Sequence, residues 1–158
     1  MGLFSFIYDN STNKTKAVAY PGLVDYVGST AVLFDADLTK GKPVSIVASG
    51  NGDATDIGTE ASSYGFIGLV KTSVSTGNTA EVLTVGSILR DVPSEYSMTG
   101  QFGKPVFISP TGTLTLTIPA IGVSGFQEGD YVIYVGSLIK GSAGETNLLI
   151  NPRIQYIL

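Results

Sequence analysis

The sequence predicts an all-β protein, a small β-barrel or β-sandwich with an extended N-terminal arm. Short apolar segments recur along the chain between turn residues, which include 20 Gly and 7 Pro, as expected of strands joined by tight turns. Residues 113–118 alternate strictly between threonine and an aliphatic residue, the period of a strand with one buried face. The phrase Gly-Lys-Pro-Val occurs at residues 41–44 and again at 103–106, which suggests two related β units.

Residues 1–20 are expected to form the arm. Its apolar start is followed by a polar stretch, residues 9–16, and then by a Pro-Gly turn at 21–22. The apolar start has no paired turn of its own, so it either adds an edge strand to the body or docks on a neighbouring chain. The candidate partner-binding residues are Leu3, Phe4, Phe6, Ile7 and Tyr8.

Residues 21–158 are expected to form the β domain, with an internal duplication around residues 41–89 and 103–139. A second echo supports the duplication, because residues 85–89 (VGSIL) return as residues 135–139 (VGSLI). The duplication predicts that Pro43 and Pro105 begin equivalent strands, where a missing N–H is tolerated. The expected strands are residues 31–34, 43–48, 65–70, 79–85, 106–109, 113–118, 131–135 and 148–158.

Two of these strands carry a specific burial pattern. In residues 113–118 the alternation predicts that Leu114, Leu116 and Ile118 face a core. Residues 131–135 are apolar on both faces, so this strand should run through the centre of the structure or be covered by a partner. Only residues 93–98 could form one or two helical turns. Helix should therefore account for less than about 10% of the chain.

The composition indicates a surface that is covered in use. Charged residues make up 14% of the chain and hydrophobic residues 43%, whereas about 25% charge is ordinary for soluble domains. Interface cores are depleted in charge, so a partner or further copies of the chain should cover much of the exterior. The alternative is a compact, neutral monomer.

Charge and segment length argue against several partners and locations. The net charge is −4 and the nine Lys and Arg residues are scattered, so no basic stripe indicates a nucleic-acid partner. No apolar run approaches the roughly 20 residues of a membrane-spanning helix. The first residues also lack the positive leader of a signal peptide. Without cysteine the fold has no disulfides.

The residue types do not favour catalysis. The chain has no His and no Cys, no base is placed beside a serine, and no Gly-x-Ser-x-Gly or Ser-x-x-Lys motif occurs. We therefore expect no enzyme activity, no cofactor and no metal. Asp35 and Asp37 resemble the Asp-x-Asp of metal-dependent sugar transferases, but a turn stabilised by Asx hydrogen bonds explains them better. Residues 51–56 carry oxygen ligands at alternate positions, as in a calcium loop, yet Asp56 stands where an EF-hand needs glycine, so a solvated loop tip is expected.

Several short motifs follow one another in an order that resembles a known family. They are Gly-Lys-Pro-Val at 41–44, Ile-Gly-Leu-Val at 67–70, a Thr-Gly-Asn turn at 76–78 and Val-Leu-Thr-Val-Gly at 82–86. This order, from residue 32 to residue 158, resembles the small β-barrel capsid decoration, or cement, proteins of tailed bacteriophages. The arm and the doubled Gly-Lys-Pro-Val unit depart from that family's pattern.

The resemblance implies a virion structural protein that stabilises the phage head through protein–protein contacts. Its implied partners are the major capsid protein or another virion structural protein and further copies of itself, with trimers common in the family. The implied location is the virion capsid, assembled in the host cytoplasm. The alternative is a phage fibre or receptor-binding β domain that recognises surface glycans. Aromatic residues that could line a sugar platform are Tyr64, Phe66, Phe102, Phe107, Phe126, Tyr131 and Tyr134, most of which we expect in the core or an interface.

Overall fold

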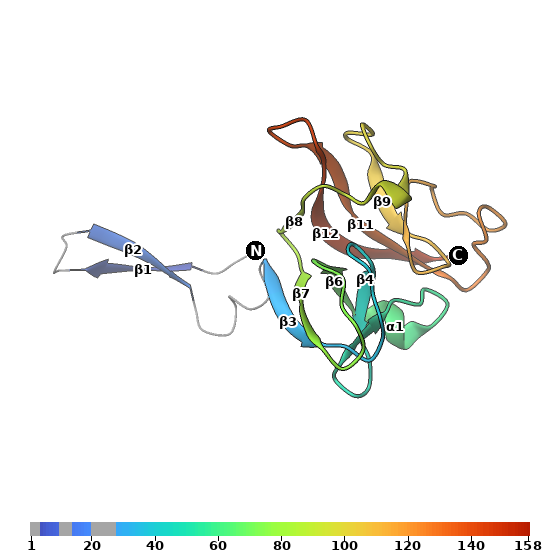
Figure 1. The fold of residues 1–158 in the computed structure, drawn as a ribbon, viewed down its shortest axis with the longest axis horizontal. Coiled ribbons are helices and arrows are strands. Elements are labelled where there is room, and N and C mark those ends of the chain that lie inside the picture. Colours follow the sequence, from blue (N-terminus) through green and yellow to red (C-terminus); the bar gives the residue numbers. More distant parts are fainter. Residues whose placement is uncertain (1–3, 10–13, 20–27) are drawn as a thin grey trace.

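The computed structural model describes residues 4–9, 14–19 and 28–158, with side chains from residue 28 onward. Strands hold 42% of the residues and helices 6%, which confirms the predicted all-β class and the low helix content. Two five-stranded sheets form the body, and a two-stranded hairpin lies away from them (Figure 1).

The first sheet has the strand order β3-β7-β6-β4-β5, with every neighbouring pair antiparallel. An isolated parallel bridge between Phe34 and Gly52 links its two edges, so the sheet curls around its own apolar cluster. A single helical turn, α1 (Glu60–Tyr64), connects β5 to β6. The strands are β3 (Ser29–Leu33), β4 (Pro43–Ile46), β5 (Gly52–Ala54), β6 (Phe66–Val70) and β7 (Thr79–Leu83).

The second sheet has the order β10-β9-β11-β12-β8 and is also antiparallel. A short 3₁₀ helix, η2 (Ser94–Tyr96), lies between β8 and β9. The strands are β8 (Ile88–Leu89), β9 (Pro105–Ile108), β10 (Leu114–Thr115), β11 (Tyr131–Lys140) and β12 (Thr146–Ile157).

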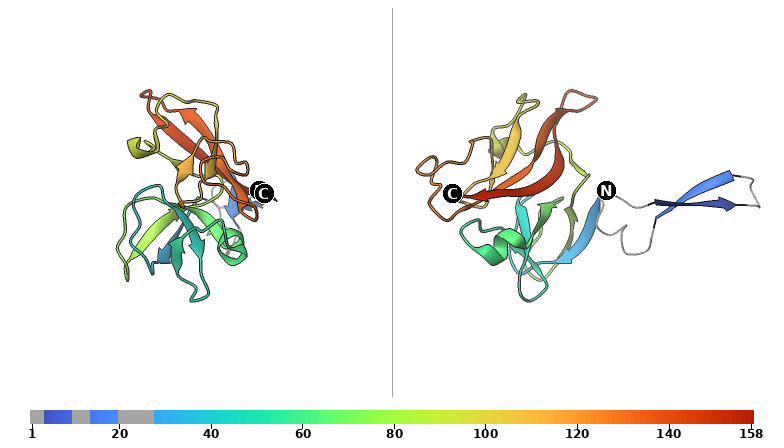
Figure 2. Two further views of the ribbon diagram at one scale, coloured as in Figure 1. Left: turned by 90° about the vertical axis from the view of Figure 1, so that its right-hand side faces the viewer. Right: turned by 180° about the vertical axis from the view of Figure 1, so that it is seen from behind.

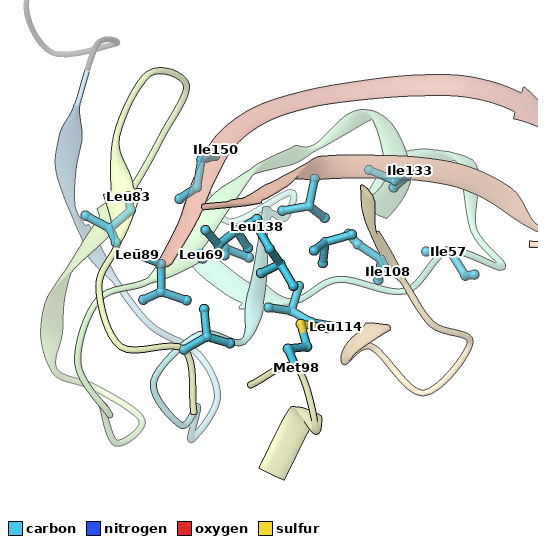
Figure 3. Close-up of a cluster of buried hydrophobic side chains, with 14 of the residues drawn as sticks. Ile57, Leu69, Leu83, Leu89, Met98, Ile108, Leu114, Ile133, Leu138 and Ile150 are labelled. Carbon is cyan, nitrogen blue, oxygen red and sulfur yellow. The ribbon is translucent and has the colours of Figure 1, made fainter. Parts of the chain in front are cut away.

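One apolar cluster joins the two sheets. Leu69 and Leu83 of the first sheet pack in the same cluster as Leu89, Leu138 and Ile150 of the second (Figure 3). All five side chains are at most 7% exposed. Burying large aliphatic side chains stabilises a fold by about 1.5–3 kcal/mol each, so the two sheets share one core.

The two sheets have the same topology. We number the five strands of each unit in chain order, starting from β3 in the first unit and from β8 in the second. In both sheets the strands then lie side by side in the order first, fifth, fourth, second, third. The repeated phrase lies at equivalent positions, because Pro43 begins β4 and Pro105 begins β9. The N–H groups of the preceding glycines, Gly41 and Gly103, donate to the carbonyls of Val70 and Leu138, each at 2.8 Å. The two prolines therefore begin equivalent strands, as the sequence predicts.

The repeat extends further than the sequence phrases indicate. Equivalent strands run from β3 to β7 and from β8 to β12, so the units span residues 29–83 and 88–157 rather than 41–89 and 103–139. The second echo is not equivalent. Residues 85–89 connect β7 to β8 and form β8, whereas residues 135–139 lie inside β11. That similarity follows from composition, since Val, Gly, Ser and Leu recur throughout this chain.

The burial of individual strands tests the sequence patterns. β11 is the central strand of its sheet, and Val132, Ile133 and Val135 are fully buried, as predicted. Leu114 is buried and Leu116 packs against the same core, but Ile118 is 69% exposed. The prediction for Ile118 is wrong because β10 ends at residue 115 and the chain then leaves the sheet.

The short elements are less predictable. Residues 93–98 contain η2, whereas α1, β5 and β8 have only five, three and two residues and were not expected. Segments of that length carry too few residues for a periodic signal.

The N-terminal segment contains a hairpin. β1 (Phe4–Asp9) pairs antiparallel with β2 (Lys14–Ala19), from Phe4 opposite Ala19 to Asp9 opposite Lys14. The expectation that the apolar start has no paired turn of its own is therefore wrong, because the polar half of the arm provides a partner strand. Leu3 and the Pro-Gly pair at 21–22 lie outside the described residues.

Gly136→Ala should break the pairing of β11 with β12. A Cβ at Gly136 would lie 1.9 Å from the carbonyl oxygen of Leu149, and Gly68 meets Leu83 in the same way in the first unit. We expect a loss of about 3 kcal/mol in the free energy of unfolding, measured by urea denaturation. The control is Gly103→Ala, where the space is open and only the φ of +77° opposes a side chain. That substitution should cost about 1–2 kcal/mol, and equal losses in the two variants would contradict the close-approach argument.

Candidate interaction surface

The loop between β10 and β11 exposes large aliphatic side chains. Residues 105–127, which include most of this loop, contain no charged residue. Ile118 is 69% exposed, Ile121 62% and Val123 43%. Single exposed apolar residues are normal, but several on one uncharged loop indicate a contact surface.

This loop is held in a defined conformation. The N–H of Gly122 donates to the carbonyl of Phe126 at 2.8 Å, and that of Val123 donates to Ala120 at 3.0 Å. Phe126 is only 1% exposed and packs in the shared core, and Pro119 is also buried. The buried anchors and the turn hydrogen bonds therefore order the loop before any partner arrives.

Further exposed apolar groups gather at the same end of the molecule. Gly129 and Leu158 are joined by a 2.8 Å hydrogen bond, which holds the end of the loop against the end of the chain. Figure 1 shows α1, this loop and the C-terminus on the side of the body away from the hairpin. We define the apolar end as Tyr64, Ile118, Ile121, Val123, Tyr156 and Ile157, all at least 43% exposed.

Tyr64 is positioned by an aromatic contact. Its ring meets that of Tyr131 edge to face, with centroids 5.7 Å apart and an interplanar angle of 69°. Burial, and then the nearby negative charge of Glu60, raises the pKa of Tyr131. Tyr131 therefore remains neutral at physiological pH, and the carboxylate of Glu60 lies near this part of the surface.

β12 also offers an incomplete edge. It pairs with β11 along its length, but with β8 only at Leu148 and Leu149, and the backbone of Ile150 also bonds to Gly86 and Ser87. Among the described residues, the remaining edge of β12 toward residue 157 has no second strand partner. An unpaired strand edge is a template for another chain. Pro152 lies within this edge and removes one of its N–H donors.

The two aspartates of the Asp-x-Asp motif tie loops together. Asp37 accepts hydrogen bonds from the N–H and the hydroxyl of Thr76, at 2.7 and 3.0 Å, which lowers the pKa of Asp37. The carboxylate of Asp35 accepts from Ser49 and Asn51, each at 2.8 Å. The motif is therefore a structural turn, but its hydrogen bonds reach other segments instead of forming local Asx turns.

The calcium-like segment is part of a sheet. Gly52–Ala54 forms β5, so the expected solvated loop tip at residues 51–56 is wrong for its central residues. Asp56 accepts a hydrogen bond from the N–H of Gly58 at 2.9 Å. Among the residues that the structure describes, no three acidic side chains lie close enough together to hold a metal ion.

A groove of about 500 Å³ lies where the two units meet and contains three basic residues. Lys71 pairs with Glu81, which also accepts a hydrogen bond from Ser29. Lys40 donates to the carbonyl of Asp91 at 3.0 Å. Since two of the three cations, Lys40 and Lys71, already serve structural contacts, the groove is a weaker candidate site than the apolar end. Its third cation is Arg90.

The partner-binding residues predicted from the sequence lie on the side of the body opposite the apolar end. Phe4, Phe6, Ile7 and Tyr8 belong to β1, and Leu3 lies outside the described residues. The structure therefore does not bring them together with the apolar end in one chain (Figure 1). The sequence interpretation missed the apolar end because it assigned Ile118 to a core strand. The uncharged stretch of residues 105–127 was the signal that could have revealed it.

The comparisons with known proteins provide no relative. No family model matches the chain, and no curated protein and no solved structure matches it closely enough to carry an argument. In the described part of the chain, neither helical segment has the length or apolar character needed to cross a membrane. Function must therefore be inferred from the surface itself.

Glu81→Gln should reduce the loss of stability in acid. The Lys71 ammonium, and then the Ser29 hydroxyl, hold the pKa of Glu81 below its ordinary value of 4.5. A lowered carboxylate pKa stabilises the folded state above the unfolded pKa, and this contribution is lost as the pH falls through the folded pKa. Urea denaturation at about pH 7 and about pH 3 should therefore show a smaller drop for Glu81→Gln than for the wild type. Glu128→Gln is the matched control, and an identical drop in all three proteins would refute the argument.

Ile121→Ser should leave the stability of the isolated protein unchanged. The side chain is 62% exposed and packs little within its own chain, so we expect a change within about 0.5 kcal/mol by urea denaturation. Ile133→Ser, at a fully buried isoleucine, should cost about 3–5 kcal/mol. A comparable loss at Ile121 would show that the loop belongs to the core rather than to an interaction surface.

Proposed function

We propose that this protein is a virion structural protein, a capsid decoration or cement protein of a tailed bacteriophage that stabilises the head through protein–protein contacts. The observation that carries the proposal is the apolar end, whose six exposed apolar or aromatic residues come from elements on one side of the body. The order of Gly-rich strand motifs, which resembles that family, agrees with it.

The energetics suit a protein that works only by contact. Each large side chain buried against a partner contributes about 1.5–3 kcal/mol before the costs of ordering. The loop that carries Ile118, Ile121 and Val123 is already ordered by turn hydrogen bonds and by Phe126. Little conformational entropy is lost when such a loop docks, so more of the burial energy appears as affinity.

The proposed partners are the major capsid protein or another virion structural protein, together with further copies of this chain. Assembly takes place in the host cytoplasm and the final location is the virion. In this proposal the protein catalyses no reaction and uses no cofactor. A charge content of 14% supports a surface that other subunits cover.

The second candidate function is a fibre or receptor-binding domain that recognises surface glycans. The observation in its favour is that the rings of Tyr64 and Tyr156 are 64% and 49% exposed, because exposed aromatic faces stack on sugars. A glycan array with wild-type protein and a Tyr64→Ala variant distinguishes the two functions. Binding that depends on Tyr64 would favour the glycan reader.

Purified protein added to phage heads that lack it should sediment with them and raise their resistance to heat. An Ile118→Ser/Ile121→Ser double variant should bind at least about tenfold more weakly, since two buried aliphatic contacts are lost. Electron microscopy of the decorated heads should show added density on the shell.

The matched control for this experiment is Leu33→Ser. Leu33 is 45% exposed in β3 and lies outside the apolar end. This variant should decorate heads as the wild type does. Wild-type protein that stays in the supernatant would contradict the proposed function, and equal binding by all variants would contradict the role of the apolar end.

A further inference from the structure

The turn before β5 contains the only Asn-Gly pair of the chain, Asn51-Gly52. Glycine has no Cβ, so its backbone nitrogen can approach the side chain of a preceding asparagine without steric hindrance. Asparagine is a thermolabile residue, and it loses its amide most readily by cyclisation through that nitrogen. Asn51 is half-buried, so water reaches it. The pair is therefore a candidate site of covalent modification.

Side-chain contacts hold Asn51 in place. Its Nδ2 donates to Oδ1 of Asp35 at 2.8 Å, and its backbone N–H donates to Oγ of Ser49 at 3.3 Å. Ser49 in turn donates to the second carboxylate oxygen of Asp35 at 2.8 Å. The carbonyl of Asn51 accepts from the N–H of Val47 at 3.0 Å. The Asn51 amide is therefore fixed on a carboxylate from another segment and is not free to turn toward the nitrogen of Gly52.

Gly52 lies at the seam that closes the first sheet. It forms the parallel bridge with Phe34, and its carbonyl accepts from the N–H of Asp35 at 3.0 Å. Phe34 is fully buried in the apolar cluster of this sheet, and a Cβ at Gly52 would lie 2.9 Å from its ring. Figure 2 shows the β4–β5 connection turned away from the second sheet. A covalent change at residues 51–52 would therefore act on the closure of the first sheet.

We propose that Asn51 is a deamidation site, which Asp35 protects while the first sheet is closed. In the reaction, the nitrogen of Gly52 loses its proton to a solvent base and attacks Cγ of Asn51. The new N–Cγ bond closes a succinimide ring, the Cγ–Nδ2 bond breaks, and Nδ2 leaves as ammonia after taking a proton from water. One water molecule then opens the ring to give aspartate or isoaspartate at position 51. The reaction needs no shell protein and no second copy, so it is independent of the proposed function.

Neither product can restore the seam. Aspartate at position 51 would place a second carboxylate against that of Asp35, and like charges at hydrogen-bond distance repel. Isoaspartate adds one carbon to the backbone between positions 51 and 52, so the bridge between Phe34 and Gly52 loses its register. Deamidation would therefore turn a temporary opening of the first sheet into a permanent one.

Peptide mass spectrometry measures the reaction on full-length protein. Wild type and Asp35→Ala are incubated in mildly alkaline buffer below their melting temperatures, and the converted fraction of Asn51 is followed with time. Asp35→Ala should convert about tenfold faster, because a hydrogen bond to a charged group is lost. In guanidinium chloride both proteins should convert at one common, higher rate, since the protection depends on the folded state.

Asp37→Ala is the matched control, because Asp37 lies in the same connection but binds Thr76. It should convert Asn51 at the wild-type rate, and equal acceleration by both variants would overturn the role of Asp35. Folded wild type that converts as fast as denatured wild type would overturn the protection, and this comparison stands even if Asp35→Ala does not fold. No conversion of Asn51 in guanidinium chloride would overturn the site itself.

Asn51→Asp reproduces one product and tests its consequence. It should melt at a lower temperature than wild type at neutral pH, because the two carboxylates repel. The control is Asn78→Asp, since the amide of Asn78 donates to the carbonyl of Ser75 at 3.3 Å in an exposed turn. That variant should melt close to wild type. An unchanged melting temperature for Asn51→Asp would show that the product does restore the seam, whereas head binding is measured separately and tests the proposed function.

Discussion

The antiparallel ladder between β11 and β12 is the constraint on which the rest of the structure depends. β11 is the central strand of the second sheet, and its inner residues Ile133, Val135 and Leu138 belong to the core that both sheets share. The ladder shifts its register just before Gly136, whose missing side chain permits the close approach to the backbone of Leu149. At the far end of the ladder, hydrogen bonds between Leu158 and residues 129 and 130 fix the root of the apolar loop. The same ladder thus supports the core and the candidate interaction surface.

The repeat shows how a common frame carries two different surfaces. Both units use a Gly-Lys-Pro-Val turn, a proline at the strand start and a glycine pressed against a neighbouring strand. They differ in the segment before the fourth strand. The first unit has the single turn α1 there, whereas the second has the uncharged loop of Ile118 and Ile121. Loops held on a rigid frame are where binding residues usually lie, and the second unit follows that rule.

The apolar end fits the low charge content of the chain. A chain with only 14% charged residues is poorly suited to a free monomer but well suited to an assembly that covers its surface. The body supplies an ordered loop that exposes Ile118, Ile121 and Val123. In the proposed decoration of a shell, apolar burial would provide affinity and peripheral charges would orient the partners.

Three features could be predicted from the sequence: the all-β class, the central place of residues 131–135 and the equivalent strand starts at Pro43 and Pro105. These features depend on local information, because period-two patterns, proline and glycine act within a few residues. Tertiary structure alone decided that β10 ends at residue 115, that Ile118 faces solvent and that residues 85–89 and 135–139 are not equivalent. It also decided where β5 and β8 form, since strands of three and two residues exist only through pairing with their neighbours. Whether an aliphatic side chain lies in the core or at the surface depends on which residues pack against it. Those residues come from segments that are distant in the sequence.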